Sequence, residues 1–257
     1  MGKTPNNYIY FNCSSYDKNN QNSTNCETWR IIGIVDGKIK IVKDDSIGNY
    51  SWDYDSSVEN YQYYNEWSRA TLKTFLNGDY YNNTITSATK TLNLISPSTW
   101  YLGGNNTPEV TAEEAYAFER GNKVYTCNEG NTEYYCAERS IKIENTAVGL
   151  MYPSDYGFAS SACREGSKTL YDYDDSSCKT SNWLFKDSNA VYEWLLSPDS
   201  GDGYGGVIDA FYLYSDGFVY TDNEVDFASG VRPSIYLDSN IELVGSGTSG
   251  EPYKIIK

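Results

Sequence analysis

The sequence predicts an α+β domain built from short, twisted antiparallel sheets, two helices and long loops stapled by disulfides. Three observations carry this prediction: strand pairs with hairpin turns, two segments with helical signals, and six cysteines in three close pairs. The 257 residues contain no repeat of fixed period and no low-complexity linker. We therefore expect a single domain over residues 1–257, in which residues 1–5 are the remnant of an expression start.

The first strands are predicted at the N-terminal end. Tyr8-Ile9-Tyr10-Phe11 has the composition of a strand. Residues 29–35 read as a strong strand and residues 38–42 as a second strand in which polar and apolar residues alternate, on either side of Asp36-Gly37. Because glycine adopts a positive φ freely, this dipeptide suits the type I′ turn of a β-hairpin.

Two helices are expected in the first half of the chain. The first runs from Asn65, which can cap its start, to Gly78 just past its end, with apolar residues at helical spacing between them. The second covers residues 108–120, where Thr111 and Glu114 have the spacing of a capping box.

The remaining strands are predicted towards the C-terminus. Ser215-Asp216-Gly217 separates residues 207–214 from 218–220 as a second hairpin. Gly230 to Leu237 has the two-residue period of a strand, and Pro233 removes one ladder donor, so this strand should lie at an edge or begin at a bend. Residues 241–256 suggest a closing strand pair.

The cysteines are expected to form three local bridges. The pairs are Cys13 with Cys26, Cys127 with Cys136, and Cys163 with Cys178. Each would close a polar segment, and a bridge of this size stabilises such a loop by about 2–4 kcal/mol. Residues 162–182 are accordingly a polar insertion, preceded by a turn at residues 154–157. Disulfides place the chain in an oxidising compartment outside the cytoplasm, whereas six reduced cysteines are the alternative.

Charge and composition argue against several classes of function. The net charge of −15 disfavours nucleic acid and anionic membranes as partners, because both require clustered Lys and Arg. The chain has no histidine, which excludes Ser-His and Cys-His catalysis and makes zinc an unsuitable metal. Its 26 tyrosines suit half-buried strand positions and also recognition surfaces.

Several motifs together resemble a known class of domains. They are Trp29-Arg30-Ile31-Ile32-Gly33, residues 45–53, Asn65-Glu66-Trp67, residues 76–80, Trp194-Leu195-Leu196-Ser197 and residues 230–237. The chain resembles uncharacterised secreted domains of Gram-positive bacteria, often attached to a pilin-like N-terminal helix, which in turn resemble the C-type lectin-like fold. The resemblance covers nearly the whole chain and implies adjacent terminal strands and a long-loop region before the last strands. No pilin-like helix is present here, and the targeting segment is expected to be absent from this chain.

In the resembled fold, ligands meet the loops before the last strands. In this chain that region is rich in aromatic and acidic side chains, about half of which should face the core instead. The residues predicted to bind a ligand are Tyr204, Asp209, Tyr212, Tyr214, Tyr220, Asp222 and Asn223. The residues predicted to be structural are Trp29, Trp67, Trp194 and Arg232, and Arg232 is expected to pair with a carboxylate such as Asp226 or Asp209.

The sequence suggests no certain cofactor, and calcium is the one candidate. Two loops, residues 199–203 and 222–226, gather the oxygen ligands that calcium prefers. The candidate ligands are Asp199, Asp202, Asp222 and Asp226, with ordinary solvated turns as the alternative. The Glu-Pro-Asn and Trp-Asn-Asp triplets of calcium-dependent lectins are absent, which argues against sugar binding through calcium.

These observations favour an extracellular binding or adhesion module at a cell surface or pilus. Its expected partner is a host or bacterial surface protein or a glycan. The first alternative is a structural pilin-like fibre subunit that contacts only its neighbours. The second is an enzyme. A formylglycine-generating activity would need a free reactive cysteine, and a glycosidase would need paired carboxylates, which 35 acidic residues supply by chance.

Overall fold

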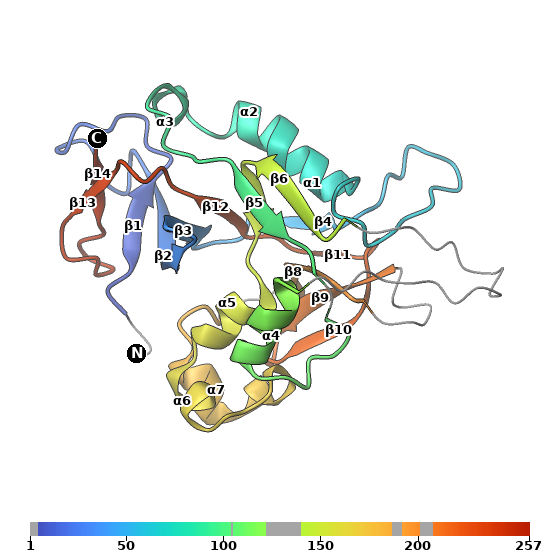
Figure 1. Cartoon of the computed structure of the whole chain (residues 1–257). Coiled ribbons are helices and arrows are strands. Elements are labelled where there is room, and N and C mark those ends of the chain that lie inside the picture. The colour runs from blue at the N-terminus through green and yellow to red at the C-terminus, as the bar shows by residue number, and fades with distance from the viewer. Residues whose placement is uncertain (1–4, 104, 122–139, 187–191, 201–207) are drawn as a thin grey trace, which may run out of the picture.

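The computed structural model describes residues 5–103, 105–121, 140–186, 192–200 and 208–257. Over these residues the protein has an α+β fold with two five-stranded sheets, two small two-stranded sheets and short helices on either side (Figure 1). None of the described helices is both long and apolar enough to cross a membrane.

The first sheet is antiparallel throughout and has the strand order β1-β2-β3-β12-β7. Its strands are β1 (Tyr8–Phe11), β2 (Glu27–Val35), β3 (Lys38–Lys43), β12 (Pro233–Tyr236) and β7 (Val148–Leu150). The expected hairpin joins β2 to β3, and Asp36 and Gly37 both have positive φ, as a type I′ turn requires. Pro233 begins β12 and is not at an edge, since β12 lies between β3 and β7.

The second sheet is mixed and has the strand order β10-β9-β8-β11-β4, with β8 and β11 parallel. Its strands are β10 (Val219–Glu224), β9 (Asp209–Tyr214), β8 (Tyr192–Pro198), β11 (Ala228–Gly230) and β4 (Asn49–Ser51). The expected second hairpin joins β9 to β10, and Gly217 supplies the positive φ in its turn.

Two small two-stranded sheets complete the fold. One pairs β13 (Glu242–Val244) with β14 (Lys254–Ile256), and the other pairs β5 (Ser98–Tyr101) with β6 (Lys142–Thr146). A parallel bridge between Ile9 and Tyr253 places the N-terminal and C-terminal strands side by side (Figure 1).

The helices are shorter and more numerous than the two expected from the sequence. In Figure 1, the helices that follow β4 lie above the sheets, whereas α4 and α5 lie to the left of β9 and β10, with α6 and α7 below them. They are α1 (Thr71–Phe75), the π-helix η1 (Leu76–Tyr80), α2 (Tyr81–Asn83), α3 (Ser87–Thr91), α4 (Ala112–Glu119), α5 (Pro153–Phe158), α6 (Ser161–Glu165), the 3-10 helix η2 (Leu170–Asp174) and α7 (Ser176–Ser181).

The first predicted helix was wrong at both ends. The structure begins the helix at Thr71, where the Asp53 carboxylate accepts a hydrogen bond from the Thr71 N–H. Asn65 does not cap it, because its side-chain amide donates to the backbone carbonyls of Asp199 and Asp209 instead. The helix also continues through Gly78 as a π-helix rather than ending there.

The second predicted helix is present as α4, with the complete capping box of Thr111 and Glu114. The turn predicted at residues 154–157 was wrong, because these residues belong to α5. Pro153 occupies the first turn of α5, where a missing N–H costs nothing, and Asp155 accepts a hydrogen bond from the Tyr152 N–H.

Two buried clusters of apolar residues form the core, and β8 and β9 contribute to both. Trp194 and Tyr212 belong to the larger cluster, whereas Leu195 and Phe211 belong to the smaller one. Because neighbouring residues of a strand point to opposite faces, the second sheet is buried on both sides along these strands. The insertion at residues 162–182, predicted to be polar, also contributes to the core. Leu170, Tyr173 and both its cysteines lie in the smaller cluster.

Candidate functional site

One face of the second sheet carries a continuous group of aromatic rings. Tyr212 and Tyr214 on β9 are two residues apart and therefore point to the same side. Neighbouring rings come from β8, from the β9–β10 hairpin and from η2. We call this group the aromatic face, and its members are Tyr171, Tyr192, Tyr212, Tyr214, Phe218 and Tyr220.

The rings of the aromatic face hold one another in place. Tyr214 and Phe218 are stacked with centroids 4.9 Å apart. Tyr192 packs edge-on against both Tyr212 and Tyr214 at 5.2 Å, and Tyr171 lies 5.6 Å from Tyr220. Because such ring pairs contribute about 0.5–1.5 kcal/mol beyond simple burial, the rings form a rigid surface that loses little entropy on binding.

The rings differ in their exposure. Tyr171 is 44% exposed, and Tyr192, Tyr214, Phe218 and Tyr220 are half-buried. Tyr212 is only 5% exposed, so it lies beneath the others. The ring surface that a ligand could contact therefore belongs to the five outer members.

Asp222 adds a charged group beside these rings. It is exposed, and one of its carboxylate oxygens accepts a hydrogen bond of 2.8 Å from the Tyr212 hydroxyl. Its negative charge raises the pKa of Tyr220, and burial together with Asp222 raises the pKa of Tyr212. The hydroxyls of Tyr212 and Tyr220 consequently stay protonated and can donate hydrogen bonds.

A second group of acids lies where β9 begins. Burial raises the pKa of Asp209 from 3.8 to about 7, and the charges of Asp199, Glu224 and Asp222 act in the same direction. One carboxylate oxygen of Asp209 is buried without a hydrogen-bond partner. Asp209 is consequently protonated in part at neutral pH.

No calcium site is formed by the predicted ligands that can be placed. Within the described ranges, no three residues among Asp, Glu, Cys and His lie close enough together to hold a metal ion. This applies to Asp199, Asp222 and Asp226, whereas Asp202 lies outside the described residues.

The predicted binding residues are divided by the structure. Tyr212, Tyr214, Tyr220 and Asp222 come together at the aromatic face. Asn223 is 9% exposed, and its side-chain amide donates to the Ser229 hydroxyl, so its side chain lies inside the fold and not at the surface that a ligand could contact. Asp209 lies with the acids at the start of β9, and Tyr204 lies outside the described residues.

Three members of the aromatic face were missed in the sequence. Residues two apart in a strand point to the same side of a sheet. Phe218 is two residues before Tyr220, and Tyr192 is two residues before Trp194, so this spacing could have predicted that both rings lie on this face. Tyr171 sits in the disulfide-closed insertion, where no sequence signal connects it to β10.

Arg232 is a buried anchor, but the expected partner was wrong. Its Nε donates to the Glu193 carboxylate at 2.7 Å, and one terminal nitrogen donates to the Leu184 carbonyl at 2.9 Å. Glu193 lies on β8 beside β11, the strand that ends just before Arg232. Asp209 and Asp226 are not its partners.

The remaining predicted structural residues lie in the core. Trp29, Trp67 and Trp194 are at most 1% exposed, and the indole N–H of Trp194 donates to the Tyr50 carbonyl. The structure contains the Cys13–Cys26 and Cys163–Cys178 disulfides. Cys127 and Cys136 lie outside the described residues.

Comparison of the chain with protein-family models, with curated proteins and with solved structures finds no match.

Proposed function

We propose that this chain is an extracellular binding module with a fold related to C-type lectin-like domains, and that it binds a glycan or a surface protein through the aromatic face. The observation that carries the proposal is the group of five outward rings beside the exposed carboxylate of Asp222.

The chemistry of this surface suits such a partner. Ring faces pack against the C–H groups of a sugar or against apolar side chains, and Asp222 accepts hydrogen bonds from hydroxyl or amide groups. Binding by these groups needs no metal ion. A chain with a net charge of −15 and a carboxylate at this surface disfavours anionic partners.

Two further features support the proposal. The pairing of the terminal strands through Ile9 and Tyr253 agrees with the adjacent termini of the resembled fold. The two disulfides favour an oxidising compartment, and so an extracellular location at a cell surface or pilus.

The test is binding of the purified chain to arrays of glycans and of immobilised surface proteins. Tyr214→Ala and Tyr220→Ala should abolish a signal seen with the parent, because both rings are partly exposed. Tyr212 is unsuitable for this purpose, since its removal would open a hole beneath the rings. Absence of any partner, together with self-association of the chain into fibres, would contradict binding and favour a structural subunit.

A further inference from the structure

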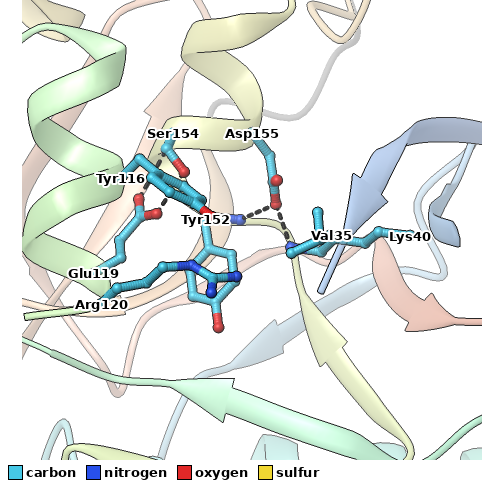
Figure 2. Close-up of a pocket in the computed structure, with 8 residues that line it drawn as sticks. All are labelled: Val35, Lys40, Tyr116, Glu119, Arg120, Tyr152, Ser154 and Asp155. Atoms are coloured by element: carbon cyan, nitrogen blue, oxygen red, sulfur yellow. Dashed lines mark hydrogen bonds and ion pairs between the residues drawn. The ribbon is translucent and has the colours of Figure 1, made fainter. Parts of the chain in front are cut away.

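A buried charge cluster lies between the first sheet and the helices below it, away from the aromatic face. Lys40 on β3 is 1% exposed, and its Nζ lies 2.5 Å from a carboxylate oxygen of Asp155 on α5. Among the described ion pairs, this is the one in which both side chains are less than a tenth exposed. Figure 2 shows the two groups facing each other.

Aromatic rings surround the Lys40 amine. Its Nζ lies 4.1 Å from the ring centroid of Tyr152, 5.3 Å from that of Trp100 and 5.7 Å from that of Tyr236. These rings keep bulk water from the ion pair. Burial therefore lowers the pKa of Lys40, although the charge of Asp155 acts in the opposite direction.

A third buried group, Glu119, completes the cluster. It lies at the end of α4, is 2% exposed, and accepts hydrogen bonds from both the N–H and the hydroxyl of Ser154, the residue before Asp155. Burial raises the pKa of Glu119 to about 8, and the charge of Asp155 adds to this effect. Glu119 thus holds a proton at neutral pH.

A small cavity connects these groups. It has a volume of about 10 Å³ and is lined by Lys40, Glu119, Ser154 and Asp155 among others. This volume is close to the space that one water molecule needs. A water molecule here can carry a proton between Glu119 and the Lys40–Asp155 pair, or leave the site.

From this geometry we propose that Lys40 and Asp155 become joined by an amide bond in the folded chain, with Glu119 as the proton carrier. The Nζ of Lys40 and the carboxyl carbon of Asp155 are held within reach of each other in a site that aromatic rings shield from bulk water, as an attack requires. The bond would tie β3 to α5 across 115 residues of sequence.

The reaction needs no oxidant, metal or co-substrate. A proton passes from the Lys40 ammonium to the Asp155 carboxylate, which gives a neutral amine and a carboxylic acid; low polarity favours this neutral pair. The amine lone pair attacks the carboxyl carbon to form the new C–N bond. By way of a water molecule in the shared cavity, Glu119 donates its proton to the leaving oxygen and takes one back from the nitrogen, so that one C–O bond breaks and one water molecule is released.

The ring-lined site favours the product. The released water moves into solvent, and the amide that remains carries no charge to be buried. The remaining oxygen of Asp155 can still accept the hydrogen bond from the Tyr152 N–H, so the capping of α5 is preserved.

The direct test is the mass of the intact, reduced and denatured chain. We expect a mass lower than that of the sequence by one water molecule, and tandem mass spectrometry should find the peptides of Lys40 and Asp155 joined. Glu119→Gln keeps the size of the side chain but cannot transfer the proton, so it should show the full mass or a slow loss of water.

Two variants separate the amide from other causes of water loss. Lys40→Arg keeps a cation but lacks a nucleophilic amine, and it should show the full mass. A succinimide formed within the chain at Asp155 would survive in Lys40→Arg, and that result would overturn the proposal. Lys142→Arg alters the exposed pair with Glu144 and should leave the water loss unchanged. A parent chain of full mass, with Lys40 open to amine reagents after denaturation, would equally overturn it.

Discussion

Arg232 shows how one side chain connects distant segments of this fold. Its guanidinium group contacts Glu193 and the Leu184 carbonyl and is 2% exposed, while burial raises the pKa of Glu193. The buried charge of each partner is compensated by the other. Such a pair contributes little relative to a well-packed apolar pair, but its disruption is costly, because one charge stays buried without compensation.

Replacing Arg232 by methionine should therefore destabilise the protein. The loss of the cation leaves the Glu193 carboxylate uncompensated, and the free energy of unfolding should fall by about 3–5 kcal/mol. Urea unfolding measures the change. The matched control is Arg164→Met, because Arg164 pairs with Glu113 on the surface, where loss of an ion pair costs about 0–1 kcal/mol. An Arg232→Met chain as stable as the parent would refute the anchoring role.

The raised pKa of Asp209 predicts that the stability of the protein depends on pH. The pKa of Asp209 rises from 3.8 to about 7 on folding. Between these values the unfolded chain has released the proton that the folded chain retains, so stability falls as pH rises through this window. Asp209→Asn should flatten that part of the profile, which urea midpoints at several pH values would record. If parent and variant lose stability in parallel between pH 4 and 7, Asp209 does not titrate in this way.

The pairing of Arg232 with Glu193 also shows what the sequence alone could not predict. Arg232 stands in an apolar segment between β11 and β12, and this apolar context indicated a buried charge with a partner. Glu193 stands in an equally apolar strand, beside Trp194, and this was the signal for the partner. The pairing itself depends on β8 lying parallel to β11, a long-range contact that no local pattern specifies.

At the scale of elements, β7 and β5 meet through a close approach of backbone to ring. Gly149 on β7 has no side chain, and a Cβ atom at this position would lie 2.7 Å from the Trp100 ring. The ring is fixed, because it is fully buried and its indole N–H donates to the Thr146 carbonyl. A glycine is therefore required here for space rather than for its φ angle.

Gly149→Ala should destabilise the chain by about 1–3 kcal/mol through overpacking. Gly33→Ala on β2 is the matched control, since nothing lies within 4 Å of the added Cβ, and it should be neutral or slightly stabilising. Thermal unfolding of both variants distinguishes them. Equal melting temperatures would show that the Trp100 ring moves aside freely.

The helices show which local signals are reliable. The capping box of Thr111 and Glu114 predicted α4 because both hydrogen bonds lie within four residues of sequence. The start of α1 could not be predicted, since the group that caps Thr71 is Asp53, which lies in a distant loop. In α5, the proline at the first position and Asp155 three residues after Tyr152 were usable signals that were overlooked.

At the scale of the whole molecule, the second sheet joins the two parts of the core and displays the aromatic face. Its β8 and β9 strands are covered by apolar clusters on both sides, which fixes the hairpin that carries Tyr214 and Phe218. The sequence predicted this hairpin, three of the six rings of the aromatic face and the neighbouring Asp222. Tyr171 could not be predicted, because the insertion that carries it meets β10 only in the folded chain.

The most direct test of binding through the aromatic face compares Tyr171→Ala with Tyr54→Ala. The two rings are similarly exposed, at 44% and 42%, but only Tyr171 belongs to the aromatic face. For the partner found on the arrays, Tyr171→Ala should raise the Kd about tenfold, which corresponds to about 1.4 kcal/mol, the size expected for an aromatic contact. Tyr54→Ala should leave the Kd at the parent value. Equal Kd values for the parent and both variants would contradict binding at this surface.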